Sequence, residues 1–132
     1  MTTVIEFSRG SEHGGYESAF RSLSEDILKK ACILYIDVPF KESLRKNRRR
    51  FNPNRPDSIL EHGLPDEKLE RLYREVDWET FKGEDPEYIH YSGHKIPYVV
   101  LHNMPEVTDD PVKLGPALDT CFTDLWNIKN KK

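Results

Sequence analysis

The sequence has 132 residues and a mass of 15.5 kDa, which suits one ordinary domain. Its 20 Lys and Arg residues against 23 Asp and Glu give a net charge of -3 and a pI near 6.0, which excludes a generally basic nucleic-acid coat or membrane surface. No run approaches the roughly 18 apolar residues of a membrane span. Cys32 and Cys121 lie in apolar segments typical of reduced core thiols. The sequence therefore predicts a soluble, cytoplasmic protein without a membrane partner.

Strands and helices alternate along the predicted chain. A β-branched run predicts a first strand over residues 2–7, which ends in a glycine-containing loop over 8–15. A short helix is expected over 16–21. Ser24 then has the position of an N-cap, with acids in the following turn, and predicts the start of the next helix.

The most apolar run of the chain, residues 31–38, predicts a strand covered on both faces, because its apolar residues are continuous and do not alternate. Residues 40–51 have helical spacing, with one apolar stripe and a largely cationic remainder. Two prolines within 52–57 end that helix. A further helix is expected from residues 65–67 onward. Its favourable i,i+4 ion pairs would be Glu67–Arg71 and Glu70–Arg74.

The last third of the chain predicts one more strand and one long helix. Residues 82–95 are expected to form a polar loop, and residues 96–102 the third strand. Residues 109–111 can start a helical turn, and Pro116 is expected in the first turn of the main C-terminal helix. This order predicts a single α/β domain over 1–132, a three-layer α/β/α arrangement with a small, mainly parallel sheet. Three strands are few, because the usual complement is about five or six.

Polar residues follow the first predicted strand. Glu6, Ser8 and Arg9 fall where residues 2–7 enter the glycine loop, and ligands of open α/β sheets bind outside the carboxyl ends of the strands. A carboxylate there could accept a proton or hold hydrated Mg²⁺, and an arginine could clamp a phosphate. The alternative is a strand-end acid paired with a nearby base. The loop itself lacks Gly-Lys-Ser/Thr and predicts a plain connection.

The strongest charge feature is a group of cations within the predicted helix 40–51. Arg45 and Arg49 lie one turn apart on one face of this helix. Cations also complement the carboxyl end of a helix, so a solvated basic turn is one interpretation. Five cations in six positions repel one another, however, and such repulsion persists most easily where an anion is bound, so we favour anion binding. The full group is Arg45, Lys46, Arg48, Arg49 and Arg50, followed by Arg55.

Other chemistry has little support in the sequence. His90 and His94 have an i,i+4 spacing but lie in the predicted loop, with no accompanying Cys or carboxylate ligand pattern, so no metal site is predicted. There is no Gly-x-Ser-x-Gly elbow on which hydrolase chemistry could depend.

Three segments together resemble the later part of P-loop kinases, closest in style to the nucleoside and nucleotide monophosphate kinases. They are Val-Ile-Glu-Phe-Ser-Arg at 4–9, Ile-Leu-Tyr-Ile-Asp-Val at 33–38, and the helical segment 42–49 with its arginines one turn apart. The resemblance implies a strand that ends in an acid and an arginine on the acceptor side. It also implies a later strand that leads into a lid helix, and a last strand over residues 96–103.

The resemblance implies a role for each of these polar residues. Glu6 would bind or deprotonate the acceptor hydroxyl, or assist magnesium, beside the substrate-binding Ser8 and Arg9. Arg45 and Arg49 would stabilise charge on the transferring phosphoryl group. Further phosphate contacts would come from Arg48, Arg50 and Arg55, and a nucleotide-base contact from Asn103.

The departure from this family is large, because the Walker A loop Gly-x-x-x-x-Gly-Lys-Ser/Thr is absent from the sequence. The resemblance then implies an incomplete P-loop NTPase-like fold that supplies the third to fifth strands of a five-stranded sheet. ATP and Mg²⁺ would be cofactors only with a complementing nucleotide-binding half, and the chain alone would be inactive. A second chain or a homo-oligomer would complete the sheet. A truncated reading frame, a split protein and a degenerate homologue are the alternatives.

The expected substrate is a nucleotide or another small phosphate acceptor. The other interpretation is a non-catalytic module that holds a polyanion or nucleic acid with the basic segment 45–55, helped by Phe51 and Tyr73 as aromatic partners. The overall acidity and the lack of a stacking motif disfavour nucleic acid as the partner.

Overall fold

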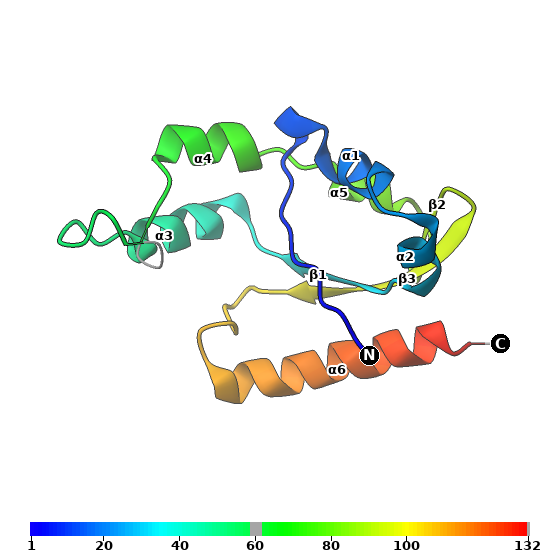
Figure 1. Cartoon of the computed structure of the whole chain (residues 1–132). Coiled ribbons are helices and arrows are strands. Elements are labelled where there is room, and N and C mark those ends of the chain that lie inside the picture. The colour runs from blue at the N-terminus through cyan, green and yellow to red at the C-terminus, as the bar shows by residue number, and fades with distance from the viewer. Residues whose placement is uncertain (59–61, 132) are drawn as a thin grey trace. The chain divides into compact units, whose positions relative to one another are not determined.

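The computed structural model describes residues 1–58 and 62–131 (Figure 1). The chain divides into two compact units, Met1–Ser22 with Leu44–Phe81 and Leu23–Ser43 with Lys82–Lys132. The single domain expected from the sequence stays a prediction. The elements in chain order are a 3-10 turn η1 (Ser11–His13), α1 (Gly15–Arg21), α2 (Glu25–Lys30), β1 (Ile33–Asp37), α3 (Phe40–Arg50), α4 (Asp66–Tyr73), α5 (Trp78–Lys82), β2 (Tyr88–Tyr91), β3 (His94–His102) and α6 (Pro111–Lys129).

A small open sheet with strand order β1–β3–β2 organises the second unit. β1 runs parallel to β3, with Ile33 opposite Tyr98 and Asp37 opposite His102. β2 runs antiparallel to β3. The fold is therefore mixed α/β. The strands predicted at 31–38 and 96–102 are confirmed, but the sheet has one parallel and one antiparallel pairing where a mainly parallel sheet was predicted.

The antiparallel strand corrects one prediction, because β2 lies within residues 82–95, which were expected to form a polar loop. Ser92 and Gly93 join β2 to β3, with φ angles of 51° and 80°. Positive φ at both central positions is what a type I′ two-residue hairpin turn requires, since its twist then matches that of the strands. The hairpin places Ile89 and Ile96 opposite each other, and both are fully buried.

Two helices contact β3 from opposite faces. The Tyr88 hydroxyl, on the face shared with Pro97, donates a hydrogen bond of 3.0 Å to the Ile128 carbonyl in α6. On the other face, His94 Nε2 lies 2.5 Å from a carboxylate oxygen of Glu25 in α2. Pro97 and His94 are three residues apart in the strand, so their side chains project to opposite sides. Figure 1 shows α6 running along one face of the sheet.

β1 is less covered than its sequence predicts. The sequence predicted burial on both faces, but none of its five residues is buried, and the Ile36 side chain is 46% exposed. Its position explains this difference: in the described part of the chain, β1 pairs with β3 on one side only and forms an edge of the sheet. The most apolar run of the chain is thus an edge strand.

Helix α6 begins earlier than predicted. The Asp110 carboxylate accepts a hydrogen bond of 3.0 Å from the Val112 N–H, and Pro111 occupies the first turn, where its missing N–H costs nothing. Pro116 therefore lies inside the helix and not in its first turn. Gly115 precedes it, at a cost of about 1 kcal/mol relative to alanine. A Cβ built on Gly115 meets no atom within 4 Å.

The two cysteines differ in environment. Cys121 is buried on the inner face of α6, and this burial raises the pKa of its thiol, with a smaller contribution from Asp124. Cys32 is exposed, which corrects the expectation that both thiols belong to the core. Its position just before the edge strand β1 accounts for the exposure.

An aromatic cluster forms the core of the first unit. Phe20 and Trp78 are its most buried members, with 6% and 4% exposure. The Asp77 carboxylate also accepts hydrogen bonds from the Tyr16 and Glu17 N–H groups at the start of α1. The ring contacts are Phe7–Tyr16, Phe7–Phe20, Tyr16–Trp78 and Phe20–Phe81, with centroid distances of 6.1, 6.2, 5.9 and 4.8 Å.

The strand predicted over residues 2–7 is wrong. Residues 1–9 are exposed and have no regular secondary structure. A β-branched run favours extended backbone, but a strand also needs a partner for its N–H and C=O groups. Among the described residues no strand pairs with this segment. Its last apolar side chain, Phe7, instead packs on the aromatic rings of Tyr16 and Phe20.

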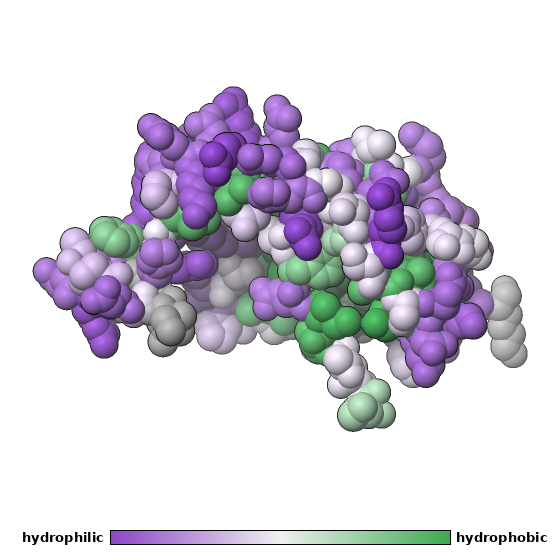
Figure 2. All heavy atoms as spheres, turned by 45° about the horizontal axis from the view of Figure 1, so that its top comes forward, coloured by the Kyte–Doolittle hydropathy of each residue, from purple (hydrophilic) through white to green (hydrophobic). Residues whose placement is uncertain are grey.

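One face of the molecule is mainly polar. Figure 2 shows hydrophilic side chains over most of one face, with apolar side chains in separate patches. In the part of the chain that the structure describes, every helix is too short or too polar to cross a membrane.

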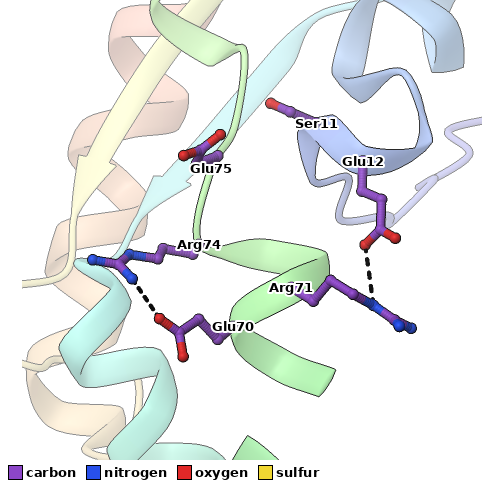
Figure 3. Close-up of a pocket in the computed structure, with 6 residues that line it drawn as sticks. All are labelled: Ser11, Glu12, Glu70, Arg71, Arg74 and Glu75. Atoms are coloured by element: carbon purple, nitrogen blue, oxygen red, sulfur yellow. Dashed lines mark hydrogen bonds and ion pairs between the residues drawn. The ribbon is translucent and has the colours of Figure 1, made fainter. Parts of the chain in front are cut away.

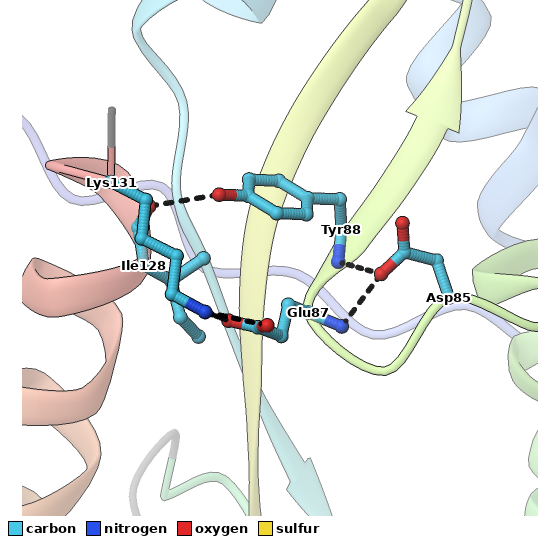
Figure 4. A network of polar contacts seen from close by, with 5 residues as sticks. All are labelled: Asp85, Glu87, Tyr88, Ile128 and Lys131. Atoms are coloured by element: carbon cyan, nitrogen blue, oxygen red, sulfur yellow. Dashed lines mark hydrogen bonds and ion pairs between the residues drawn. The ribbon is translucent and has the colours of Figure 1, made fainter.

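A polar network joins the start of β2 to the end of α6 (Figure 4). Asp85 accepts hydrogen bonds from the Glu87 and Tyr88 N–H groups, at 2.9 and 3.1 Å, and its other oxygen lies 2.8 Å from His90 Nε2. The Glu87 N–H, followed by His90, lowers the pKa of Asp85 to about 2. Lys131 pairs with Glu87, and this contact raises the pKa of the lysine.

We predict that Asp85 makes the stability of this unit pH-dependent. The pKa of Asp85 is lower in the folded than in the unfolded chain, so its contribution is present above about pH 4 and is lost between about pH 4 and pH 2. Asp85→Asn keeps the acceptor for both N–H groups but removes this titration. Urea midpoints measured from pH 6 to pH 2 should fall less for Asp85→Asn than for the wild type, whereas Glu84→Gln, next to it, should follow the wild type. Parallel curves for all three would contradict the assignment.

Candidate functional site

The basic residues of α3 divide between two sides of the helix. At about 100° per residue, Arg45, Lys46, Arg49 and Arg50 fall on one continuous arc, which we call the cationic face. Three of these side chains are exposed and Lys46 is half-buried. The stripe of Phe40, Leu44, Asn47 and Phe51 lies on the opposite side. The sequence prediction that Arg45 and Arg49 share one helical face is thus confirmed.

The opposite side of α3 is anchored to the segment that leads into α4. The Asn47 amide donates to the Leu64 carbonyl at 2.6 Å and accepts from the Leu64 N–H at 2.9 Å. Next to it, Gly63 leaves room for this contact, because a Cβ at that position would lie 2.9 Å from the Asn47 carbonyl oxygen. One side chain therefore binds a backbone N–H and a backbone C=O and fixes the rotation of α3 about its axis.

Arg48 takes part in the same anchor. Its Nε and Nη2 atoms lie 3.0 and 2.6 Å from one carboxylate oxygen of Asp66, the first residue of α4. The hydrogen bond raises the pKa of Arg48 and lowers that of Asp66. The sequence suggested a phosphate contact for Arg48, but here its charge is engaged by a carboxylate. That role stays a prediction, and the structural contact is the one that positions the helix.

The proposed acceptor residues lie outside any strand. Glu6, Ser8 and Arg9 belong to the exposed N-terminal segment, so the strand end on which their prediction depended does not exist. They share the first unit with the cationic face. Arg55 is exposed in the turn after α3, where its N–H donates to the Asn52 carbonyl at 3.0 Å. The structure thus groups the helix arginines and leaves Glu6 on irregular backbone.

Asn103 belongs to the other unit and is 1% exposed. Its amide oxygen accepts from the Val107 N–H at 2.8 Å, and its amide nitrogen donates to Thr108 Oγ1 at 3.2 Å. Its backbone N–H donates to the Asp37 carbonyl at 2.9 Å. The side chain closes its own loop, so the nucleotide-base contact would require this loop to open.

Sequence reasoning missed a pair of side chains at the carboxyl ends of the parallel strands. Asp37 and His102 are register partners, and His102 Nδ1 lies 3.1 Å from a carboxylate oxygen of Asp37. Both side chains are largely exposed. A carboxylate that holds one imidazole nitrogen leaves the other, Nε2, able to exchange a proton with a ligand. Spacing could not reveal this pair, because its members are 65 residues apart in the chain.

A hollow of about 380 Å³ lies between η1 and α4 in the first unit (Figure 3). Arg71 reaches Glu12 at 3.4 Å, and Arg74 pairs with Glu70, as the sequence predicted for that pair. The predicted partner of Arg71 was Glu67. Glu75 and Ser11 complete the lining. Three carboxylates against two guanidinium groups make this hollow unsuitable for a phosphate.

In residues 1–58 and 62–131, the His, Cys, Asp and Glu side chains form no group of three or more that could hold a metal ion. His90 and His94 instead pair separately with Asp85 and Glu25.

The chain was also compared with known families, curated proteins and solved structures. No family model, no curated protein and no solved structure matches it. The geometry of the cationic face and of the sheet therefore carries the functional argument.

Proposed function

We propose that this chain is a phosphotransferase-related, P-loop kinase-like domain that binds phosphoryl groups through the cationic face of α3. It would transfer no phosphate alone, and would work with a second polypeptide that supplies a phosphate-binding loop. The proposal extends the resemblance of segments 4–9, 33–38 and 42–49 to the kinase family. It also places the chain in the cytoplasm, where Mg²⁺ and ATP would be its cofactors and a nucleotide or small phosphate acceptor its substrate.

The observation that carries this proposal is the separation of two functions on α3. Asn47 and Arg48 hold one side of the helix against Leu64 and Asp66, so the other side keeps a fixed orientation. Guanidinium groups one turn apart, such as those of Arg45 and Arg49, can donate to different oxygens of the same phosphoryl group. Arginines held in this way are suited to stabilise charge that develops during phosphoryl transfer.

The edge strand β1 supports the need for a second polypeptide. None of the five residues of β1 is buried, so this apolar strand leaves apolar surface in water. An edge strand also presents backbone groups with which another strand can pair. A strand added beside β1 would extend the sheet on the side away from β3. α3 starts only three residues after β1 ends, so such a strand would end near the start of the arginine helix.

We predict that the chain binds Mg·ATP or inorganic triphosphate through the cationic face. The double substitution R45Q/R49Q should weaken binding by about tenfold or more, because it removes two charge-assisted contacts of more than 1 kcal/mol each. Isothermal titration calorimetry at low salt measures this. The matched control K29Q/K113Q removes the same charge from exposed lysines elsewhere and should leave affinity almost unchanged. Equal losses of affinity in both variants would show that the effect comes from the net charge and not from the cationic face.

We also predict the conditions for turnover. With ATP and Mg²⁺ alone the chain should transfer no phosphate, because it has no Walker A loop. Co-expression with a chain that carries Gly-x-x-x-x-Gly-Lys-Ser/Thr should restore transfer, measured as release of ADP. In the restored enzyme, R45A/R49A should lower the rate by about 100-fold or more. A full rate with both arginines removed would show that α3 does not act as the lid.

The second candidate is a non-catalytic module for a polyanion or nucleic acid. One observation favours it: the cations run along the whole carboxyl-terminal half of α3 and continue to Arg55, a length that suits several consecutive phosphates. The unpaired N-terminal segment also removes the strand end at which an acceptor would bind. Phe51 is 47% exposed and could stack on a base at the end of this surface.

A salt titration separates the two candidates. A single-stranded oligonucleotide held by the four cations of the cationic face should show a slope of about −3 in a plot of log K against log salt concentration. Fluorescence anisotropy from 50 to about 300 mM salt measures the slope over a suitable range. A slope near zero, with triphosphate binding retained, would exclude recognition of a nucleic-acid backbone and favour the phosphotransferase-related function.

A further inference from the structure

We propose that the chain forms a symmetric dimer in which the exposed aromatic stripe of α6 packs antiparallel against the same stripe of a second copy. This inference is independent of phosphate binding, since it concerns a helix of the second unit. It depends on three features of α6: a second apolar stripe, an open glycine in its middle, and charges of opposite sign at its two ends.

The solvent side of α6 has two different halves. At about 100° per residue, Lys113, Thr120, Asp124 and Asn127 fall on one half, which is polar. The other half carries the exposed apolar side chains of Val112, Phe122 and Trp126, which are 82%, 53% and 68% exposed, and the exposed carboxylate of Asp119 lies among them. Both halves are distinct from the inner face, where Cys121 and Leu125 are buried against the unit. An aromatic stripe of this kind on the outside of a helix is typical of an interaction surface.

Gly115 lies on the same arc as Phe122 and Trp126. Glycine lowers the stability of a helix interior, and here a Cβ would meet nothing within 4 Å, so the chain's own packing does not require glycine. A residue without a side chain leaves a shallow depression between exposed neighbours. Its size and position suit an aromatic ring from a second helix that crosses at this point.

The charges at the two ends of α6 indicate that its partner is a second copy of the chain and that the two helices run antiparallel. Asp109 and Asp110 precede its first turn, and Lys129 lies in its last turn. The ammonium group of Lys129 contacts a neutral carbonyl, that of Lys30, so its charge is not neutralised there. A second copy in antiparallel orientation brings the acidic start of each helix beside the basic end of the other, whereas a parallel copy would place like charges together. The two ends of α6 are therefore complementary to each other in an antiparallel pair.

A single register follows from seating Trp126 of each copy over Gly115 of the other. The twofold axis then passes between positions 120 and 121, beside Phe122 of each copy. The two Asp119 carboxylates also lie beside this axis, and their repulsion weakens the contact. The helix is 19 residues long, or about 28 Å, so the contact is small. We expect a weak, concentration-dependent dimer.

Sedimentation equilibrium on the full chain, from about 10 μM to 1 mM, tests the association. Wild type should shift from monomer to dimer, and tryptophan emission should shift to the blue as Trp126 leaves water. Trp126→Glu and Gly115→Leu should both remain monomeric: the first removes the ring that the seat receives, and the second fills that seat. Val4→Glu, at an apolar position that is 86% exposed, should dimerise like the wild type.

Chemical cross-linking tests the direction in a Cys32→Ser background. Asp119→Cys lies beside the proposed axis and should link to itself through a short bis-maleimide. Lys129→Cys should not, because its two copies would be about 25 Å apart along the helix axis at 1.5 Å per residue. A monomer at all concentrations, a dimer unaffected by both Trp126→Glu and Gly115→Leu, a dimer lost in Val4→Glu, or linkage through Lys129→Cys would each overturn the proposal. Circular dichroism and urea unfolding confirm that each variant is folded.

Discussion

The pairing of β3 with a strand on each side is the constraint on which the second unit depends. β3 contributes the buried residues Ile96, Tyr98 and Leu101, and it contacts β1, β2, α2 and α6. Its parallel pairing with β1 brings Asp37 and His102 together at one end of the sheet, and the chain enters α3 directly from that end. Because β1 has a partner on one side only among the described residues, the same pairing leaves the apolar strand as an open edge.

The charge pattern of α3 can be understood from its anchor. Like charges a few ångströms apart in water repel by about 1 kcal/mol, so the four cations of the cationic face lower the stability of the chain by a modest amount. The Asn47 contact with Leu64 and the Arg48 pair with Asp66 fix the helix against that repulsion. A bound phosphoryl group would relieve it. The anchor on one side of α3 therefore explains why the cations stay together on the other side. Without the anchor, the helix could rotate or shift so that these charges move apart.

What the sequence could predict depended on whether its signal was local. The Ser24 cap and the basic helix were predicted because caps and helical periodicity act within a few residues. Residues 2–7 failed as a strand because β propensity cannot provide a pairing partner. β2 was missed although Tyr-Ile-His-Tyr followed by Ser-Gly carries the local pattern of a hairpin. The Asp37–His102 pair and the closed loop of Asn103 come from long-range register and burial, which spacing in one sequence does not contain.

Two surfaces of the second unit leave apolar groups in water, and both follow from its size. A small unit with a three-stranded sheet buries a smaller fraction of its surface than a large domain does, so more of its apolar surface stays exposed. The edge of β1 offers backbone groups and suits an added strand, whereas the outer stripe of α6 offers aromatic side chains and suits a helix. α6 packs on a face of the sheet through Leu125 and Cys121, so its outer stripe and the β1 edge do not overlap. A dimer through α6 would therefore leave β1 open, and a second polypeptide could join each copy without displacing the other.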